Sequence, residues 1–165
     1  MTLYSSNEKD LLIDAARRGD VSYIKQKIED GIDLNATDAR GYTALIIASY
    51  DGNLEVTRLL LNAGAEANAR DASGNTALMG VSFKGYHEVA RLLIEKGADI
   101  NAVNGNGGTA LMFATLFGRN ELAKVLLECG ADTSLRDVQG LSALDLAHQQ
   151  GNEEAIVLLT QEKTE

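Results

Sequence analysis

Short apolar blocks recur along the chain at a spacing of 33 residues. Each unit carries an Ala-Leu pair behind a threonine or serine, and a second apolar pair about 15 residues further on. In the segment 86–96, Val89, Leu92 and Leu93 fall at helical spacings. The pattern therefore predicts two short helices per unit, copied in tandem. Helices this short are marginal in isolation, so we expect their Ala and Leu positions to be buried against neighbouring copies.

Polar residues and glycines mark where these helices begin and end. In the unit that starts at Asp71, Thr76 is a candidate N-cap, because its hydroxyl can accept a backbone N–H of the following turn. Gly85 is expected to end the first helix, and Gly97 the second in a left-handed conformation. Asp-Ala-Ser-Gly at 71–74 is typical of a turn. Each unit thus reads as a turn, a helix, a glycine turn, a second helix and a loop.

These units resemble the ankyrin repeat, whose pattern is a β-turn followed by two antiparallel helices with a T-P-L-H-x-A signature. The implied fold class is all-α, an ankyrin-repeat solenoid of stacked helix-turn-helix units with β-turn or hairpin fingers. The resemblance covers nearly all of residues 1–165 as a single domain. An N-terminal capping repeat at 5–37 is followed by full repeats at 38–70, 71–103 and 104–136 and a C-terminal capping repeat at 137–161.

The chain departs from that signature in two ways. It contains no proline, so Thr-Ala-Leu stands where the family often has Thr-Pro-Leu. The histidine position is occupied by Ile46, Met79, Met112 and Asp145. Stability is therefore expected to depend more on apolar packing than on polar links near this turn. Such variants are similar to bacterial members of the family.

The resemblance also implies where a partner binds. In ankyrin-like stacks the turn tips and the solvent side of the first helices line a concave groove, and family members usually bind protein there. Carried over position by position, this places Arg17 and Arg18 on the same face of the first unit. The candidate protein-binding residues are Arg40, Tyr42, Tyr50, Asp51, Asn75, Phe83, Lys84, Leu116, Phe117 and Leu141.

An apolar column at 33-residue spacing is the strongest candidate within this set. Tyr50, Phe83 and Leu116 share it, so they are expected to form a ladder along the stack, with Phe117 beside it. Aromatic residues supply many interface hot spots, and we interpret the column as a binding patch. The alternative is that these side chains pack on neighbouring repeats and close the groove.

One unit differs inside its first helix. It has Gly80-Val81 where other units place a bulky residue followed by alanine. Glycine here is expected to make room for the β-branched valine. Because glycine costs about 1 kcal/mol relative to alanine within a helix, this helix should be the softest in the middle of the stack.

The formal net charge of −9 is unevenly distributed, since residues 137–165 hold six acidic residues against one lysine. We favour a polar outer face that keeps the terminal repeat soluble, and a partner with a basic patch is the alternative. The acidic charge, and the lack of a Lys/Arg stripe with interleaved aromatics, argue against nucleic-acid binding. No stretch is long and apolar enough for a membrane span, and we expect a monomer.

Candidate catalytic and cofactor residues do not assemble into a site, so we expect a non-enzymatic protein without cofactor or metal. Cys129, His87 and His148 lack partners at catalytic or metal-ligand spacing, and 104–108 lacks the lysine of a phosphate loop. A single cysteine and an N-terminus without a secretory pattern favour a cytoplasmic location. Two other functions remain open: a regulatory or stabilising subunit of a separately encoded enzyme, and a secreted effector that acts on a host protein.

Overall fold

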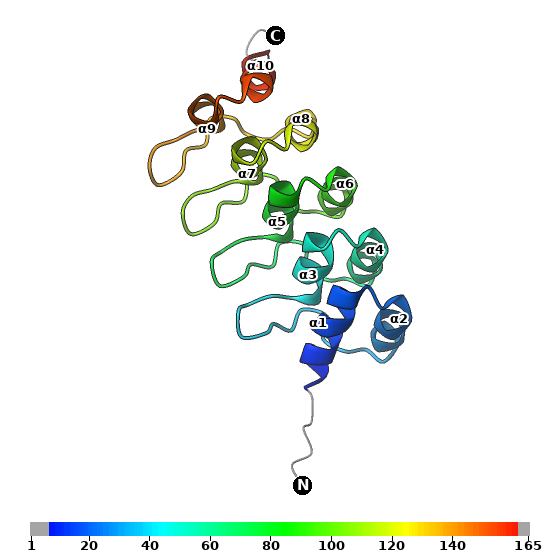
Figure 1. The fold of residues 1–165 in the computed structure, drawn as a ribbon. Helices are drawn as coiled ribbons and strands as arrows, with labels where there is room; N and C mark the ends of the chain where they lie inside the picture. Colours follow the sequence, from blue (N-terminus) through cyan, green and yellow to red (C-terminus); the bar gives the residue numbers. More distant parts are fainter. Residues whose placement is uncertain (1–6, 162–165) are drawn as a thin grey trace.

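The computed structural model describes residues 7–161, which form ten helices and, within that range, no strand. Figure 1 shows the helices in two rows, with loops extending from the inner row toward one side. The first helices of successive pairs are α1 (Glu8–Arg18), α3 (Ala44–Tyr50), α5 (Ala77–Lys84), α7 (Ala110–Leu116) and α9 (Ala143–Gln150). The second helices are α2 (Val21–Glu29), α4 (Leu54–Asn62), α6 (His87–Glu95), α8 (Asn120–Glu128) and α10 (Glu153–Gln161). This is the all-α repeat stack that the sequence predicts.

The predicted helix boundaries of the third unit are confirmed by the hydrogen bonds at its ends. The Thr76 hydroxyl accepts the backbone N–H of Met79 at 3.4 Å, and thereby satisfies one of the free donors of the first turn. Gly85 follows α5 with a φ of 87°, and Gly97 lies just beyond α6 with a φ of 98°. A side chain would be strained at such angles, which is why glycine recurs at both positions. The equivalent caps of α3, α7 and α9 are Thr43, Thr109 and Ser142.

The second helices begin in two different ways. Asn53 caps α4, because its side chain accepts the N–H of Val56 at 3.0 Å. Tyr86 and Arg119 occupy the same position before α6 and α8, and neither makes a side-chain cap. Arg119 instead donates its Nε to the carbonyl oxygen of Phe83 at 3.0 Å, across the boundary between repeats. At the start of α8, a contact between Arg119 and the preceding repeat thus takes the place of a side-chain cap.

One apolar core runs between the two rows of helices. Leu45, Leu78 and Leu111 come from equivalent positions of three first helices, and each is at most 2% exposed. Each first helix packs on the first helix of the next pair, and α2, α4, α6, α8 and α10 pack on one another in the same way. The Ala and Leu positions are therefore buried by neighbouring copies, as expected for helices too short to be stable alone.

The loops between pairs form the fingers on one side of the stack in Figure 1. In the finger that leads to α5, Asp71 Oδ1 accepts the N–H groups of Ser73 and Asn75, both at 2.9 Å. Asp38, Asn104 and Asp137 make the same pair of bonds in the other fingers. Neighbouring fingers are joined by backbone bonds of 2.9–3.1 Å, in which Ala72, Gly105 and Val138 donate to the carbonyls of Arg40, Ser73 and Asn106. The fingers consequently form a continuous wall.

A second set of links lies at the opposite ends of the repeats. Asn35 Oδ1 accepts the N–H of Glu66 at 2.8 Å, and Asn101 Oδ1 accepts that of Asp132 at 2.8 Å. Asn68 does the same for Asp99, at 2.6 Å. These bonds explain why asparagine recurs here at the repeat spacing.

Candidate functional site

An aromatic ladder follows the C-terminal ends of three first helices. The rings of Tyr50 and Phe83 are stacked, with centroids 6.3 Å apart and planes only 4° from parallel. Phe83 then meets Phe117 edge to face, with centroids 4.6 Å apart. Tyr50 is 39% exposed and Phe117 43% exposed, whereas Phe83 between them is half-buried. The ladder is therefore accessible to solvent along part of its length.

The ladder differs from the sequence expectation in its third member. Leu116 shares the column of Tyr50 and Phe83, but its half-buried side chain packs against the core. Phe117, one residue later, makes the ring contact with Phe83 instead. Leu116 has no ring to place against Phe83, so the aromatic contact falls to the next residue, which directly follows the end of α7 at Leu116. Phe117 is thus the C-cap residue of α7 and projects beside the column.

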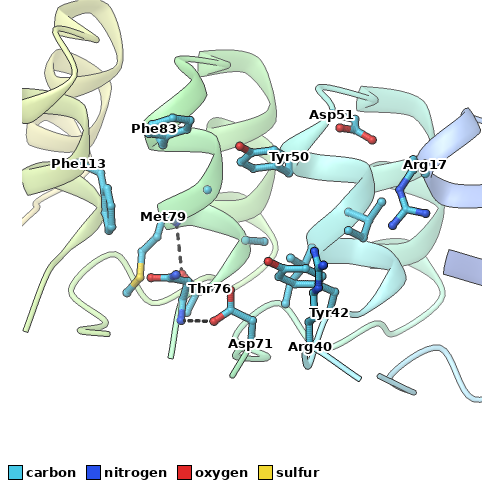
Figure 2. Close-up of a pocket in the computed structure, with 15 residues that line it drawn as sticks. Arg17, Arg40, Tyr42, Tyr50, Asp51, Asp71, Thr76, Met79, Phe83 and Phe113 are labelled. Carbon is cyan, nitrogen blue, oxygen red and sulfur yellow. Dashed lines mark hydrogen bonds between the residues drawn. The ribbon is translucent and has the colours of Figure 1, made fainter. Parts of the chain in front are cut away.

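A hollow of about 580 Å³ lies between these rings and the fingers (Figure 2). Its floor is apolar and includes Ile46, Ile47 and Met79, all buried. Gly80 lies between Ile47 and Phe113 in one repeat column, so the absence of a side chain there deepens the hollow, and the Tyr50 ring covers part of that space. Apolar floors with a few polar groups on the rim are characteristic of binding sites.

Gly80 also explains the position of the Tyr50 ring. A Cβ atom added at Gly80 would lie 3.2 Å from Tyr50 Cδ2, which is tighter than ordinary van der Waals contact. From the sequence, Gly80 is expected to make room for Val81, which is fully buried. The close approach of Tyr50 is a second reason for glycine at this position, and it connects an unusual helix residue directly to the groove.

Charged and polar side chains form the rim of the hollow. Figure 2 shows Arg40 and Tyr42 at the finger edge, Arg17 projecting from α1, and Asp51 near the end of α3. Among residues 7–161, the side chains of Arg40 and Asp51 make no hydrogen bond or ion pair with another residue. Asp71, in contrast, is committed to the backbone of its own finger. The rim therefore offers one cationic and one anionic group without an internal partner.

A second, smaller hollow of about 330 Å³ continues the groove over the last two repeats. Phe113 lines both hollows and separates them. The apolar lining here includes Met112 and Leu116, and the polar lining is mainly uncharged amides, namely Asn104, Asn106, Gln139 and Gln149. The two halves of the groove thus differ in chemistry, with charged groups on one rim and amides on the other.

The candidate residues are distributed over these features as follows. The structure brings six of them together around the first hollow: Arg40, Tyr42, Tyr50, Asp51, Asn75 and Phe83. Leu116 and Leu141 line the second hollow. Phe117 belongs to the ladder, and Lys84 lies over the Tyr50 ring with its Nζ 5.0 Å from the centroid. Arg17 lines the first hollow, and Arg18 does not.

Some residues that line the first hollow were not predicted from the sequence. Phe113, Met79, Ile46 and Ile47 were not selected, because each lies in a column that reads as buried core. A signal was nevertheless present in the Ile47 column, where Gly80 interrupts a series of bulky residues at 33-residue spacing. A large residue, a glycine and a second large residue in consecutive repeats imply a depression between two walls.

The other chemically notable residues lie outside the groove. Cys129, His87 and His148 are exposed. No group of three or more metal-ligating side chains comes together within residues 7–161.

Hydrogen bonds from the Ser142 backbone and hydroxyl, with a smaller contribution from Arg136, lower the pKa of Asp145 below its ordinary value. In the same described part of the chain, none of the helices has the length and apolarity to cross a membrane.

The stacked helix pairs, the wall of fingers and the groove beside them together define a helical repeat protein. The family model for ankyrin repeats (three copies) matches residues 12–104 and 81–165, so the chain belongs to the ankyrin-repeat family. Ankyrin repeats are generally protein–protein interaction modules, and the family is typically non-enzymatic. A search of curated proteins found no match to the chain.

Proposed function

We propose that the chain is a non-enzymatic module that binds a partner protein in its concave groove. The observation that carries this proposal is the hollow of about 580 Å³, with its apolar floor and partly exposed rings. Tyr50 and Phe117 are each more than one third exposed, although large aromatic side chains are usually covered. Rigid aromatic residues at the rim of an apolar hollow are typical of interface hot spots.

The proposal that the groove is not catalytic rests on how its charged groups are used. Asp71 accepts two backbone N–H groups and thereby shapes its finger. Asp51 and Arg40 are both exposed, so neither lies in the desolvated setting that tunes an acid or base. A broad open groove also excludes little water from a reacting group.

The partner class follows from charge and composition. With a net charge of −9, the chain would repel phosphate backbones, so a protein is proposed rather than a nucleic acid. Because the last repeat is acidic, we include a contact with a basic patch on the partner in the proposal.

The helix pairs within 5–37 and 137–161 are proposed to cap a single domain that acts as a monomer. The single cysteine supports a cytoplasmic location.

The test is affinity capture from a lysate of the source cells with a groove variant and a matched control. The groove variant carries Tyr50→Ala and Phe83→Ala. The control carries Tyr86→Ala and Val103→Ala, which remove exposed apolar groups that line neither hollow. We expect the groove variant to lose at least about tenfold in partner capture, because hot-spot residues each contribute about 2 kcal/mol or more.

Both variants should melt within a few degrees of the wild-type protein, since the altered side chains are exposed or half-buried. Unchanged capture by the groove variant would contradict the proposal. A collapse of its melting temperature would instead assign Tyr50 and Phe83 to the core and leave the groove without anchors.

A further inference from the structure

The charged groups around the first hollow indicate which kind of peptide fits it. We propose that the groove accepts an extended peptide segment in which one large apolar side chain is followed or preceded, two to three residues away, by an aspartate or glutamate. The inference rests on the proposed function and specifies the partner of the same groove. The apolar side chain enters the hollow beside Gly80, between the Tyr50 and Phe113 rings, and the carboxylate meets Arg40.

The backbone of Arg40 is fixed at the finger edge by hydrogen bonds. Its N–H donates to Asp38 Oδ1 at 2.9 Å, and its carbonyl accepts the N–H of Ala72 at 3.0 Å. The guanidinium group makes no hydrogen bond or ion pair within residues 7–161 and lies at the finger edge beside Tyr42 (Figure 2). A planar guanidinium binds a carboxylate through two parallel hydrogen bonds, and its rigid fork loses less freedom per hydrogen bond than a flexible ammonium group would.

The remaining charges favour a carboxylate on the finger side. Arg17 also lines the hollow, and its ion pair with Asp14 joins two side chains that are each 51% exposed, so water and other acids compete for it. Asp71 lies in the finger beside the hollow, and the two backbone N–H groups that donate to its Oδ1 offset part of its negative charge. Asp51 lies at the opposite rim, by the end of α3 (Figure 2). An acidic peptide residue would therefore meet cations at the fingers and avoid the unpaired anion.

The spacing within the peptide follows from the spacing of the repeats. Packed helices lie about 8–10 Å apart, and an extended chain advances about 3.3 Å per residue. One repeat therefore corresponds to about three peptide residues. Arg40 belongs to the repeat before Gly80, which places the acidic residue two to three positions from the apolar one.

An extended backbone is favoured over a compact ligand by the second hollow. Phe113 is shared by both hollows, so a segment that fills the first can continue into the second. The amides of Asn104, Asn106 and Gln139 line that continuation, and they can both donate to and accept from a peptide backbone. The net charge of −9 opposes an acidic segment only weakly, since charges beyond about 10 Å are screened at ordinary salt.

The experiment begins with random peptides of about twelve residues displayed on phage, which is long enough to span the fingers. They are selected on the wild-type protein and depleted on the Tyr50→Ala, Phe83→Ala variant. We expect the recovered sequences to share a large apolar residue with Asp or Glu two to three positions away. Synthetic copies are then titrated into the wild type, Arg40→Gln and the matched control Arg58→Gln, which removes an exposed charge on α4 away from both hollows.

The methionines provide a readout of where each peptide binds. The chain has three, of which Met79 lines the first hollow and Met112 the second. With ¹³C-methyl methionine, bound peptides should shift the Met79 signal, and longer ones the Met112 signal as well. Arg40→Gln should weaken binding by about ten- to a hundredfold, as expected for loss of a charge-assisted bidentate contact, and Arg58→Gln by less than about twofold.

The outcomes separate this inference from the proposed function. Peptides that shift Met79 but lack an acidic residue, or that bind Arg40→Gln as tightly as wild type, overturn the inference and leave a protein-binding groove. Peptides rich in Lys or Arg overturn it in favour of recognition by Asp51. Recovery of no peptide that depends on Tyr50 and Phe83 removes the support for the groove itself. Both arginine variants alter exposed side chains, and their melting temperatures confirm that they fold.

Discussion

The two faces of the first helices differ in how far they change from repeat to repeat. On the buried face, Leu45, Leu78 and Leu111 are the same residue with the same burial. On the groove face, the column through Gly80 passes from isoleucine to glycine to phenylalanine. Each repeat buries its inner face against a nearly identical neighbour, which fixes the residue type there. The groove face contacts its neighbours only at scattered points such as Tyr50 and Phe83, so its residue types can vary to match what lies outside.

Two leucines of α7 test this contrast most strongly. Leu111 is 2% exposed in the core, whereas Leu116 is half-buried beside the second hollow. Leu111→Ala should lower the free energy of unfolding by about 2–5 kcal/mol, because it leaves a cavity between packed helices. Leu116→Ala should cost roughly 1 kcal/mol, since less area is lost and solvent can enter. Urea denaturation followed by circular dichroism measures both, and equal losses would show that the groove face is part of the core.

Gly80→Ala should move stability and binding in opposite directions. Alanine favours the helical state by up to about 1 kcal/mol, but its Cβ would lie 3.2 Å from Tyr50 Cδ2. Because Tyr50 is 39% exposed, we expect its ring to shift and the helix to gain stability while the hollow loses affinity for peptide. Thermal melting and peptide titration report the two effects.

The control for Gly80→Ala is the same change in a Tyr50→Ala background. Without the ring the full gain in stability should appear. If Gly80→Ala destabilises the wild-type chain instead, the Tyr50 ring is held as firmly as a core residue, and the distinction between the two faces fails at this position.

The smallest expected effect on stability is that of Asp145, which takes part in a helix cap where the equivalent residues of other repeats line a hollow. It occupies the position of Met79 and Met112, but its side chain accepts from the Ser142 backbone and hydroxyl and so completes the capping box of α9, whose N-cap is Ser142. Its pKa is lowered by those bonds, so its stabilising contribution is present above the ordinary carboxyl pKa and is lost as the pH falls through the folded value.

The difference in urea midpoint between wild type and Asp145→Ala should therefore shrink as the pH is lowered below about 4. A difference that stays constant through the acid range would mean that the cap does not depend on the carboxylate.

The fold was predictable because its signals are local and repeated. Thr76 and Gly85 specify helix ends through their own chemistry, and the repeat spacing then places the N-caps of α3, α7 and α9. The groove was predictable only in outline. The repeat spacing assigned Leu116 to the ladder, but the ring that contacts Phe83 belongs to Phe117, one residue outside that column. Phe113 and Met79 read as core residues, because sequence spacing does not tell which side of a buried helix meets an open hollow.

The finger wall has a mechanical consequence. Between the second and fifth repeats, each finger is tied to the next by a backbone bond between Arg40 and Ala72, Ser73 and Gly105, or Asn106 and Val138. Such a row can open one finger at a time from either end, since opening one finger affects only its immediate neighbours. A ligand bound across several fingers would therefore slow hydrogen exchange in the fingers that it contacts and in those directly bonded to them. The length of chain that it protects would then show how far the ligand extends along the stack.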